Sequence, residues 1–310
     1  MEVIRFNEYV KKDVKVALSV AIGEFDGLHL GHMRLINKAI EEAALHKMKS
    51  AVITFEPHPQ AFIKKVDDYA YITPLCDKIQ ILRAFKLDYL IIIDFNDEVM
   101  MASPQAFVQD FLVQIQAKCV VVGNDFTFGF KKEGKASDLE KLSHGNLQVH
   151  IMDDVKYESW KISSSLIREK IENGAFVDVQ KMLGRFYQLK GTVTRGRGVG
   201  HTIDLPTINL DFSSNYVMPK PGVYGTIVEV DGKKYIGLAN YGHNPSFNYK
   251  KCLTLEINLL DIDIDLYDKE VSASFVCFIR DEIKFASTKD FLKQIAIDKA
   301  KIRKIVSIYL

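Results

Sequence analysis

The sequence predicts an α/β protein, in which a doubly wound parallel-sheet domain precedes a small antiparallel β-barrel domain with a terminal helix. Apolar, strand-like runs alternate with helical patterns over the first half of the chain, which is the order of βαβ units. After residue 184 short β-like runs follow one another, and a single helical pattern ends the chain. Because 310 residues exceed one typical domain, we expect two, 1–184 and 185–310.

In the first domain, apolar β-branched runs predict strands, and apolar residues at helical spacing predict the helices between them. The expected helices cover 30–48, 75–86 and 104–116, with a further helical stretch over 164–183. Parallel sheets of this kind bind ligands at the carboxyl ends of their strands, so the informative loops should follow strands. The expected strands are Val16–Ile22, Ala51–Phe55, Tyr89–Asp94, Lys118–Gly123 and Leu147–Met152.

In the second domain, short β-like runs predict a small antiparallel barrel or sandwich. Asp231-Gly232 separates two of these runs and is typical of a hairpin turn. Apolar residues at helical spacing predict a final helix over Thr288–Tyr309, capped by Ser287 or Thr288. The expected strands are Leu189–Thr194, Gly222–Val230, Lys234–Ala239, Leu253–Leu260 and Val271–Ile279.

Composition and charge exclude several classes of protein. The 41 basic and 40 acidic residues give a net charge of +1, which argues against a general nucleic-acid or membrane-surface role. No basic start leads into an apolar segment, and no run of 18 apolar residues occurs, so we expect neither a signal peptide nor a membrane span. Cysteines 76, 119, 252 and 277 form no Cys-x-x-Cys pair, which favours reduced, buried cysteines in a cytoplasmic protein.

The segment Gly23–His32 follows the first predicted strand and reads Gly-Glu-Phe-Asp-Gly-Leu-His-Leu-Gly-His. Gly27 and Gly31 permit a tight turn and the close approach of a ligand. His29 and His32 stand one turn apart at the start of a helix, where free main-chain N–H groups and the helix dipole favour anions. Two imidazoles there can donate to a phosphate and offset the charge that develops during attack on it. A helix cap and half of a metal site are the alternatives, but no further ligands have useful spacing.

A second group of anion-binding residues opens the helical stretch at Ile162–Arg168. The hydroxyls of Ser164 and Ser165 and the guanidinium of Arg168 can hold phosphate oxygens. An ordinary serine cap with a surface arginine is the alternative. Two such groups in one domain suit a nucleoside triphosphate, one near the reacting phosphorus and one on the leaving pyrophosphate.

Two loops at strand ends add candidates. Asp125, after the strand Lys118–Gly123, could hydrogen-bond a flavin, a base or a ribose, or could cap a turn. The neighbouring residues Phe126, Phe128 and Phe130 could form the wall of an aromatic-ligand site or belong to the core. His58 lies between two prolines and is a candidate substrate contact.

The second domain carries its own candidates. The glycine-rich, basic segment Thr194–His201, with Gly198, offers main-chain donors to phosphate, unless it is only a surface loop. Thr207 and Asn209 share a face if their segment is a strand, and their oxygens suit Mg²⁺ with phosphate. Glu256 lies in an otherwise largely apolar strand, where it could deprotonate an attacking hydroxyl or simply face solvent.

Together these segments resemble the bifunctional bacterial riboflavin kinase/FMN adenylyltransferase (FAD synthetase) family, from about residue 16 to 310. The His-x-Gly-His spelling after a strand and a glycine-rich turn also resembles the nucleotidylyltransferase superfamily. The segments that carry the resemblance are Gly23–His32, Thr54–Pro59, Leu75 onward, Val121–Gly129, Ser163–Arg168, Leu183–Arg185, Pro206–Leu210, Pro221–Tyr224, Leu255–Leu260, Leu266-Tyr267 and Arg280–Glu282 with Lys284-Phe285.

The resemblance implies two reactions on small-molecule substrates. In the barrel domain, the ribityl 5′-hydroxyl of riboflavin attacks the γ-phosphate of ATP to give FMN, with Glu256 as base and Thr207 and Asn209 around Mg²⁺. In the first domain, the phosphate of FMN attacks the α-phosphorus of a second ATP, giving FAD and pyrophosphate. It implies phosphate contacts for His29, His32, Ser164, Ser165 and Arg168, and ATP or flavin contacts for Gly23, Phe25, Asp26, Gly27, Gly31, His58, Asp125, Ser165, Gly198 and Arg280.

The chain departs from the family pattern in the barrel. His201 stands where the family has Arg and Asp204 where it has Gly, and both changes should weaken ATP binding. The segment 240–246 is also altered, and Thr127 in the first domain stands where Arg is common. An alternative is therefore an FMN adenylyltransferase whose weak or inactive barrel serves flavin binding, regulation or oligomerisation. A nucleic-acid-binding barrel is disfavoured by the charge balance, and homo-oligomerisation stays open.

Overall fold

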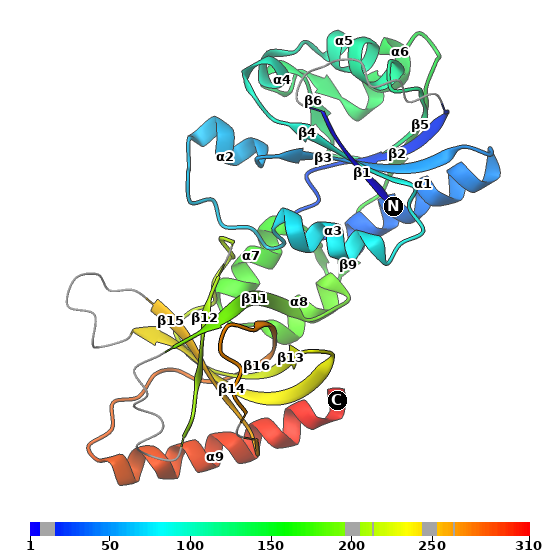
Figure 1. Ribbon diagram of the computed structural model, residues 1–310. Helices are drawn as coiled ribbons and strands as arrows, with labels where there is room; N and C mark the ends of the chain where they lie inside the picture. The colour runs from blue at the N-terminus through cyan, green and yellow to red at the C-terminus, as the bar shows by residue number, and fades with distance from the viewer. Residues whose placement is uncertain (7–15, 196–204, 213, 244–252, 263) are drawn as a thin grey trace. The chain divides into compact units, whose positions relative to one another are not determined.

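The computed structural model describes residues 1–6, 16–195, 205–212, 214–243, 253–262 and 264–310 (Figure 1). The chain divides into two compact units, Met1–Ser164 and Ser165–Leu310. The first unit holds a six-stranded parallel sheet and the second a closed, six-stranded antiparallel barrel, which confirms the predicted fold class. The predicted domain boundary after residue 184 stays a prediction.

The strand order of the sheet reverses its direction at β2. From β2 the chain winds first to β3 and β4 on one side and then to β5 and β8 on the other. Such a switch point, at the carboxyl ends of the strands, is where doubly wound sheets bind ligands. The order is β1 (Glu2–Phe6), β4 (Tyr89–Asp94), β3 (Lys49–Glu56), β2 (Leu18–Ile22), β5 (Ala117–Gly123) and β8 (Gln148–Met152).

Both faces of this sheet are buried, as the apolar strand runs predicted. Val20 of β2 packs with Phe107 on one face, whereas its neighbour Ala21 packs with Ala39 on the other. The five predicted strands are all present. The sixth, β1, was not predicted; it adds to the edge through parallel pairing of Glu2 with Tyr89.

The helices of the first unit differ from prediction in several places. The predicted helix over 104–116 consists of a short α-helix followed by a π-helix, and α2, α4, α6 and the short η2 and η3 were not predicted. The helices are α1 (Leu30–Leu45), α2 (Pro59–Lys64), α3 (Leu75–Arg83), α4 (Asp97–Met101), α5 (Pro104–Ala106), the π-helix η1 (Phe107–Val113), η2 (Phe130–Lys132), η3 (Ala136–Asp138) and α6 (Leu139–Leu142). Two small hairpins pair β6 (Thr127–Phe128) with β7 (Gly134–Lys135) and β9 (Lys156–Tyr157) with β10 (Trp160–Lys161).

The predicted helical stretch 164–183 is two helices, α7 (Ser164–Glu172) and α8 (Phe176–Leu183), separated at Gly174, whose φ is +72°. Both precede the barrel, whose strands lie in the order β11 (Tyr187–Thr194), β12 (Ile208–Asp211), β15 (Leu253–Leu259), β14 (Lys233–His243), β13 (Gly222–Val230) and β16 (Glu270–Arg280).

Asp231 and Gly232 join β13 to β14 with φ values of +50° and +74°, the left-handed pair that a type I′ hairpin turn needs. The final helix α9 (Thr288–Val306) packs along β13, β14 and β16 (Figure 1), and the short η5 (Ser307–Tyr309) ends it. Ser287 caps α9 by accepting from the N–H of Asp290, as expected. Both the turn and the cap were therefore predictable from local sequence.

Within the described ranges, no helix has both the length and the apolarity needed to cross a bilayer. Cys119 and Cys277 are free and buried, as predicted, whereas Cys76 is free but exposed, which corrects the expectation for that residue. Cys252 and several residues discussed above, namely Gly198, His201, Asp204 and 244–246, lie outside the described residues.

Candidate active site

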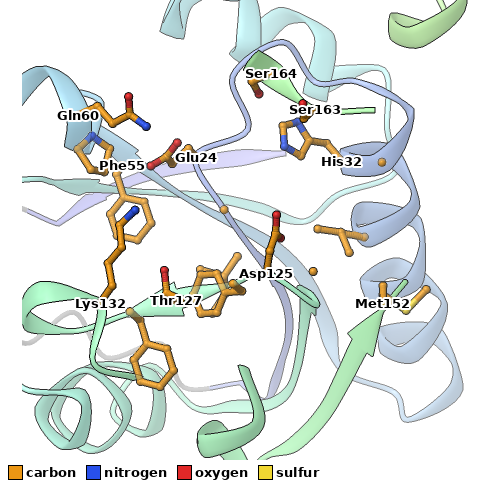
Figure 2. Close-up of a pocket in the computed structure, with 18 of the residues that line it drawn as sticks. Glu24, His32, Phe55, Gln60, Asp125, Thr127, Lys132, Met152, Ser163 and Ser164 are labelled. Carbon is orange, nitrogen blue, oxygen red and sulfur yellow. The ribbon is translucent and has the colours of Figure 1, made fainter. Parts of the chain in front are cut away.

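A cavity of about 800 Å³ lies at the carboxyl ends of β2, β3, β5 and β8 in the first unit, a volume typical of small-molecule sites (Figure 2). Figure 2 shows His32, Ser163 and Ser164 on one side of it and Phe55, Gln60 and Lys132 on another. The aromatic wall consists of Phe55, Phe95, Phe107, Phe126, Phe128 and Phe130. The charged and polar lining includes Glu24, His29, His32, Gln60, Asp125, Thr127, Lys131, Lys132, Asp153, Asp154, Lys161, Ser163 and Ser164.

His29 and His32 both line this cavity at the start of α1. His29 is the N-cap, and its Nδ1 accepts from the main-chain N–H of His32 at 3.2 Å. Because that nitrogen accepts, the proton of a neutral His29 ring lies on Nε2. The two rings stack with centroids 3.6 Å apart and planes at 16°. His29 therefore caps the helix and lines the cavity at once, so the cap and the phosphate-site interpretations are compatible.

Phe25, Asp26 and Gly27 are buried and are not among the residues that line the cavity. The Oδ1 of Asp26 accepts from the main-chain N–H groups of residues 72 and 73, both at 3.0 Å. Phe25 packs its ring edge-on against His32, with centroids 5.1 Å apart. These residues fix the loop that carries the histidines, and their direct contact with ATP or flavin stays a prediction.

Gly23 and Gly31 line the cavity where a side chain would crowd it. A Cβ on Gly31 would lie 3.1 Å from the ring of His29, and one on Gly23 would lie 3.3 Å from the ring of Phe25. Both positions therefore favour glycine because it leaves the ring positions undisturbed.

Ser164 connects the two segments that the sequence singled out as phosphate sites. Its Oγ donates to the main-chain carbonyl of Asp26 at 2.8 Å, across 138 residues of sequence. Ser163 and Ser164 both line the cavity. Ser165 and Arg168 belong to the second compact unit, so their place at the phosphates stays a prediction.

His58 is buried and supports Glu24, a residue that the sequence reasoning did not single out. His58 Nδ1 accepts from the N–H of Gln60, and its Nε2 lies 2.9 Å from Oε2 of Glu24. Burial raises the pKa of Glu24, but the hydrogen bond and charge of His58 outweigh it, and the pKa is lowered overall. The cavity thus contains a carboxylate whose position in the sequence, inside the glycine-rich segment, was the available signal.

Asp125 lines the cavity with its carboxylate paired to Lys161 at 2.6 Å. Lys161 also lies 2.9 Å from Asp154. Burial lowers the pKa of Lys161, but the two carboxylates raise it by more, so the ammonium remains charged. This lysine was not predicted, and it places a cation in the lining of the cavity.

Two further lysines were missed by the sequence reasoning. Lys131 and Lys132 lie in η2, between β6 and β7, and both line the cavity. Their φ values are +50° and +61°, so the loop turns tightly here. The signal was the basic pair directly after Phe126–Phe130, at the carboxyl end of a predicted strand.

In the barrel, Asn209 of β12 and Glu256 of β15 are direct partners in antiparallel register. Residues opposite one another in such a pair project to the same side of the sheet. Burial raises the pKa of the Glu256 carboxyl. Thr207 precedes β12, so the condition for a shared strand face with Asn209 is not met; it lines a separate cavity of about 240 Å³ with Tyr267.

Arg280 holds the terminal helix to the barrel. Its Nε donates to Oδ2 of Asp298 in α9 at 2.8 Å, and the Asp298 side chain is only 2% exposed. Gln294 donates to the other oxygen of Asp298 at 2.9 Å. Arg280 therefore has a structural role in this unit. Its contact with ATP or flavin stays a prediction.

Known proteins resemble the chain along nearly its whole length. The family model described as FAD synthetase matches residues 11–166, and that described as riboflavin kinase matches 183–306. A bifunctional riboflavin kinase/FMN adenylyltransferase from Listeria monocytogenes is 35% identical over 92% of this chain and 91% of its own. The proteins of the same name from Bacillus subtilis and Escherichia coli K12 are 32% identical (93% of this chain, 92% of the relative) and 30% identical (98% and 97%).

A crystal structure from Streptococcus pneumoniae, described as a macrolide-efflux protein, shares the fold. It superposes with a TM-score of 0.88 at 29% identity, covering 97% of this chain and 98% of that one.

Proposed function

This chain belongs to the bifunctional riboflavin kinase/FMN adenylyltransferase family, and we propose that it makes FMN in its barrel and FAD in the cavity of its first unit. Both family domains are present, which supports two activities over an adenylyltransferase with a silent barrel. The observation that carries the first assignment is the placement of His29 and His32 at a helix start, in a cavity at the switch point of the sheet.

In the adenylyl transfer, a phosphate oxygen of FMN attacks the α-phosphorus of ATP. A new P–O bond forms as the bond to the β-phosphate breaks, and pyrophosphate leaves. FMN supplies the nucleophile, so the protein contributes orientation and charge stabilisation. The imidazoles of His29 and His32 and the main-chain N–H groups of α1 supply donors, and the phenylalanine wall accommodates an aromatic ring of a substrate.

In the kinase reaction, Glu256 takes the proton from the ribityl 5′-hydroxyl, the oxygen attacks the γ-phosphorus of ATP, and ADP leaves. A carboxyl whose pKa is raised by burial is a stronger base than an exposed one. Asn209 faces Glu256 across the strand pair, and Thr207 lies just before β12. Their neutral oxygens fit the Mg²⁺ that arrives with ATP, because Mg²⁺ prefers oxygen ligands and retains waters.

Product analysis by HPLC, with Mg-ATP and either riboflavin or FMN, tests the proposal. We expect FMN and then FAD from riboflavin, and FAD directly from FMN. FAD from FMN with riboflavin untouched would leave the kinase half wrong, and no product from either substrate would overturn both halves.

The setting of these reactions is part of the proposal. The balanced charge and the free cysteines favour a cytoplasmic enzyme of small-molecule substrates without a nucleic-acid partner. Homo-oligomerisation stays a prediction, testable by the mass of the protein in solution.

A further inference from the structure

A second cluster of ligand-type side chains lies in the first unit, apart from the cavity. Glu42 of α1, Cys119 of β5 and His150 of β8 each offer one ligand atom, and the three atoms lie within 4.8 Å of one another. None of the three residues is among those that line the cavity. By helical rise, Glu42 lies about 18 Å along α1 from Leu30, where the helix begins.

The fold brings these side chains together on the α1 face of the sheet. Cys119 belongs to the apolar cluster on that face, together with Val121, two residues further along β5. His150 is the register partner of Val121, so its side chain projects to the same face. Cys119 is fully buried, and the side chains of Glu42 and His150 are 6% and 24% exposed.

One buried polar atom at this place lacks a hydrogen bond. Nε2 of His150 lies 3.5 Å from Oε1 of Glu42 and has no hydrogen-bond partner among the described residues. The neighbouring thiol of Cys119 is hydrogen-bonded to the side chain of Ser19, its register partner in β2. Because buried polar groups are nearly always satisfied, the unpaired imidazole nitrogen beside a thiol and a carboxylate points to a missing ligand.

The alternative is that these side chains interact only through charge, without a bound ligand, and it explains fewer of the observations. Lys38 Nζ lies 2.6 Å from Oε1 of Glu42, and its hydrogen bond lowers the pKa of Glu42, which stays a carboxylate. That ion pair accounts for the charge of Glu42 but leaves the buried His150 Nε2 without a hydrogen bond. Carboxylates that bind metals are commonly held by such an outer hydrogen bond, so Lys38 is compatible with a metal on Glu42.

We propose that Glu42, Cys119 and His150 form a binding site for one divalent transition-metal ion of the Zn²⁺ type. A thiolate, an imidazole and a carboxylate are the ligands that Zn²⁺ and Co²⁺ accept, whereas Mg²⁺ and Ca²⁺ prefer oxygen alone. The fourth position falls to water, as in zinc sites with three protein ligands. Binding releases the thiol proton to solvent and links α1, β5 and β8, which together carry part of the cavity.

The test is a titration of the metal-free, full-length protein with Co²⁺, followed by absorption in the near ultraviolet. A cobalt–thiolate charge-transfer band should rise to one equivalent and vanish when Zn²⁺ is added. Cys119→Ser should abolish the band, whereas Cys76→Ser, which removes an exposed free thiol, should keep it. Loss of an outer partner alone weakens a metal site 10–100-fold, so His150→Gln should weaken Co²⁺ binding by at least about tenfold.

Several results would overturn the site. They are no band with the wild-type protein, a band that survives Cys119→Ser, or one that Cys76→Ser removes. His32→Gln must leave the band intact, which separates this site from the histidine pair of the cavity. If circular dichroism shows that Cys119→Ser is unfolded, His150→Gln and Glu42→Gln decide the question, and unchanged Co²⁺ affinity in both rejects the site.

Discussion

Lys78 donates a hydrogen bond from its buried ammonium to the main-chain carbonyl of Glu24 at 2.8 Å, directly beneath the loop that leads to the two histidines. It donates a second to Oγ1 of Thr54 at 3.2 Å. Burial lowers the pKa of Lys78, while the nearby carboxylates of Asp26 and Glu56 act in the opposite direction. Through these two hydrogen bonds, Lys78 ties α3 to the strand-to-helix loop of the first unit.

Lys78→Met should lower the free energy of unfolding by about 2–3 kcal/mol, because it removes the donor to the Glu24 carbonyl and the Thr54 hydroxyl and leaves these buried oxygens less well satisfied. Urea unfolding followed by circular dichroism measures this. Lys86→Met, at an exposed lysine nearby, is the control and should change stability by less than about 0.5 kcal/mol. Equal stability of the two variants would refute the structural role of Lys78.

His32→Gln should lower kcat for FAD formation from FMN by about 10²–10³-fold, the usual cost of one donor to a developing anion. The same variant should form FMN from riboflavin at the wild-type rate, because that reaction takes place in the barrel. Both rates come from HPLC time courses. Loss of both activities in a folded variant would show that the assignment of the two reactions to separate domains is wrong.

Glu256→Gln should abolish FMN formation and spare FAD formation from FMN. In the wild type, the acid limb of the kinase pH–rate profile should lie above the ordinary glutamate pKa of 4.5, because burial raises the pKa of this carboxyl. A limb at or below that value would contradict its role as base.

The raised pKa of Glu256 should also make the free energy of unfolding depend on pH, in a direction that can be stated. The folded chain holds this proton more tightly than the unfolded chain, so the contribution of Glu256 to stability falls as pH rises from 4.5 through the raised value. Glu256→Gln removes that effect and should therefore gain stability relative to wild type at pH 7 compared with pH 4. Thermal unfolding at the two pH values measures the difference, and a constant difference would argue against a buried, ionised Glu256.

Arg280→Met and Asp298→Asn should each lower the stability of the flavin-free protein by about 3 kcal/mol, because each leaves a buried charge or its partner unpaired. The double variant should cost less than the sum of the two single variants. If Arg280 served only to bind ATP or flavin, the unliganded protein would unfold at its usual denaturant concentration.

Gly129→Ala should destabilise the first unit by more than Gly145→Ala. Both glycines have positive φ, +73° and +77°, and a Cβ on Gly145 would meet nothing within 4 Å. On Gly129 the Cβ would lie 2.8 Å from the backbone nitrogen of Pro104, which cannot move aside as a flexible side chain would. We expect about 1 kcal/mol for Gly145→Ala and about 2–3 kcal/mol for Gly129→Ala. Equal losses in urea unfolding would mean that the contact with Pro104 is unimportant.

Local sequence patterns predicted most of the fold and the histidine segment of the candidate site. The run ending at Ile22, the glycine-rich turn and His29 and His32 are specified within a few residues of one another, so the sequence predicted them together. The edge strand β1 was missed because its place depends on pairing with β4, more than 80 residues later. The opposition of Asn209 and Glu256 likewise depends on strand register, which neither segment encodes alone.

The sequence analysis missed several residues of the cavity for a different reason. Glu24 lies inside the segment that the sequence emphasised, but its role depends on His58, which reaches it from α2. Lys131 and Lys132 depend on a turn with positive φ that their residue type does not favour. Long-range contacts and unusual backbone conformations determine these positions. The periodicity of apolar residues in the sequence indicates neither of them.

The hydrogen bond between Ser164 and Asp26 has a consequence for biosynthesis. The histidine segment leaves the ribosome early, whereas Ser163 and Ser164 are the last residues of the first unit to be synthesised. The nascent chain therefore lacks part of the cavity lining until the entire unit has emerged. A ligand that needs Ser163 or Ser164 can stabilise only the finished unit.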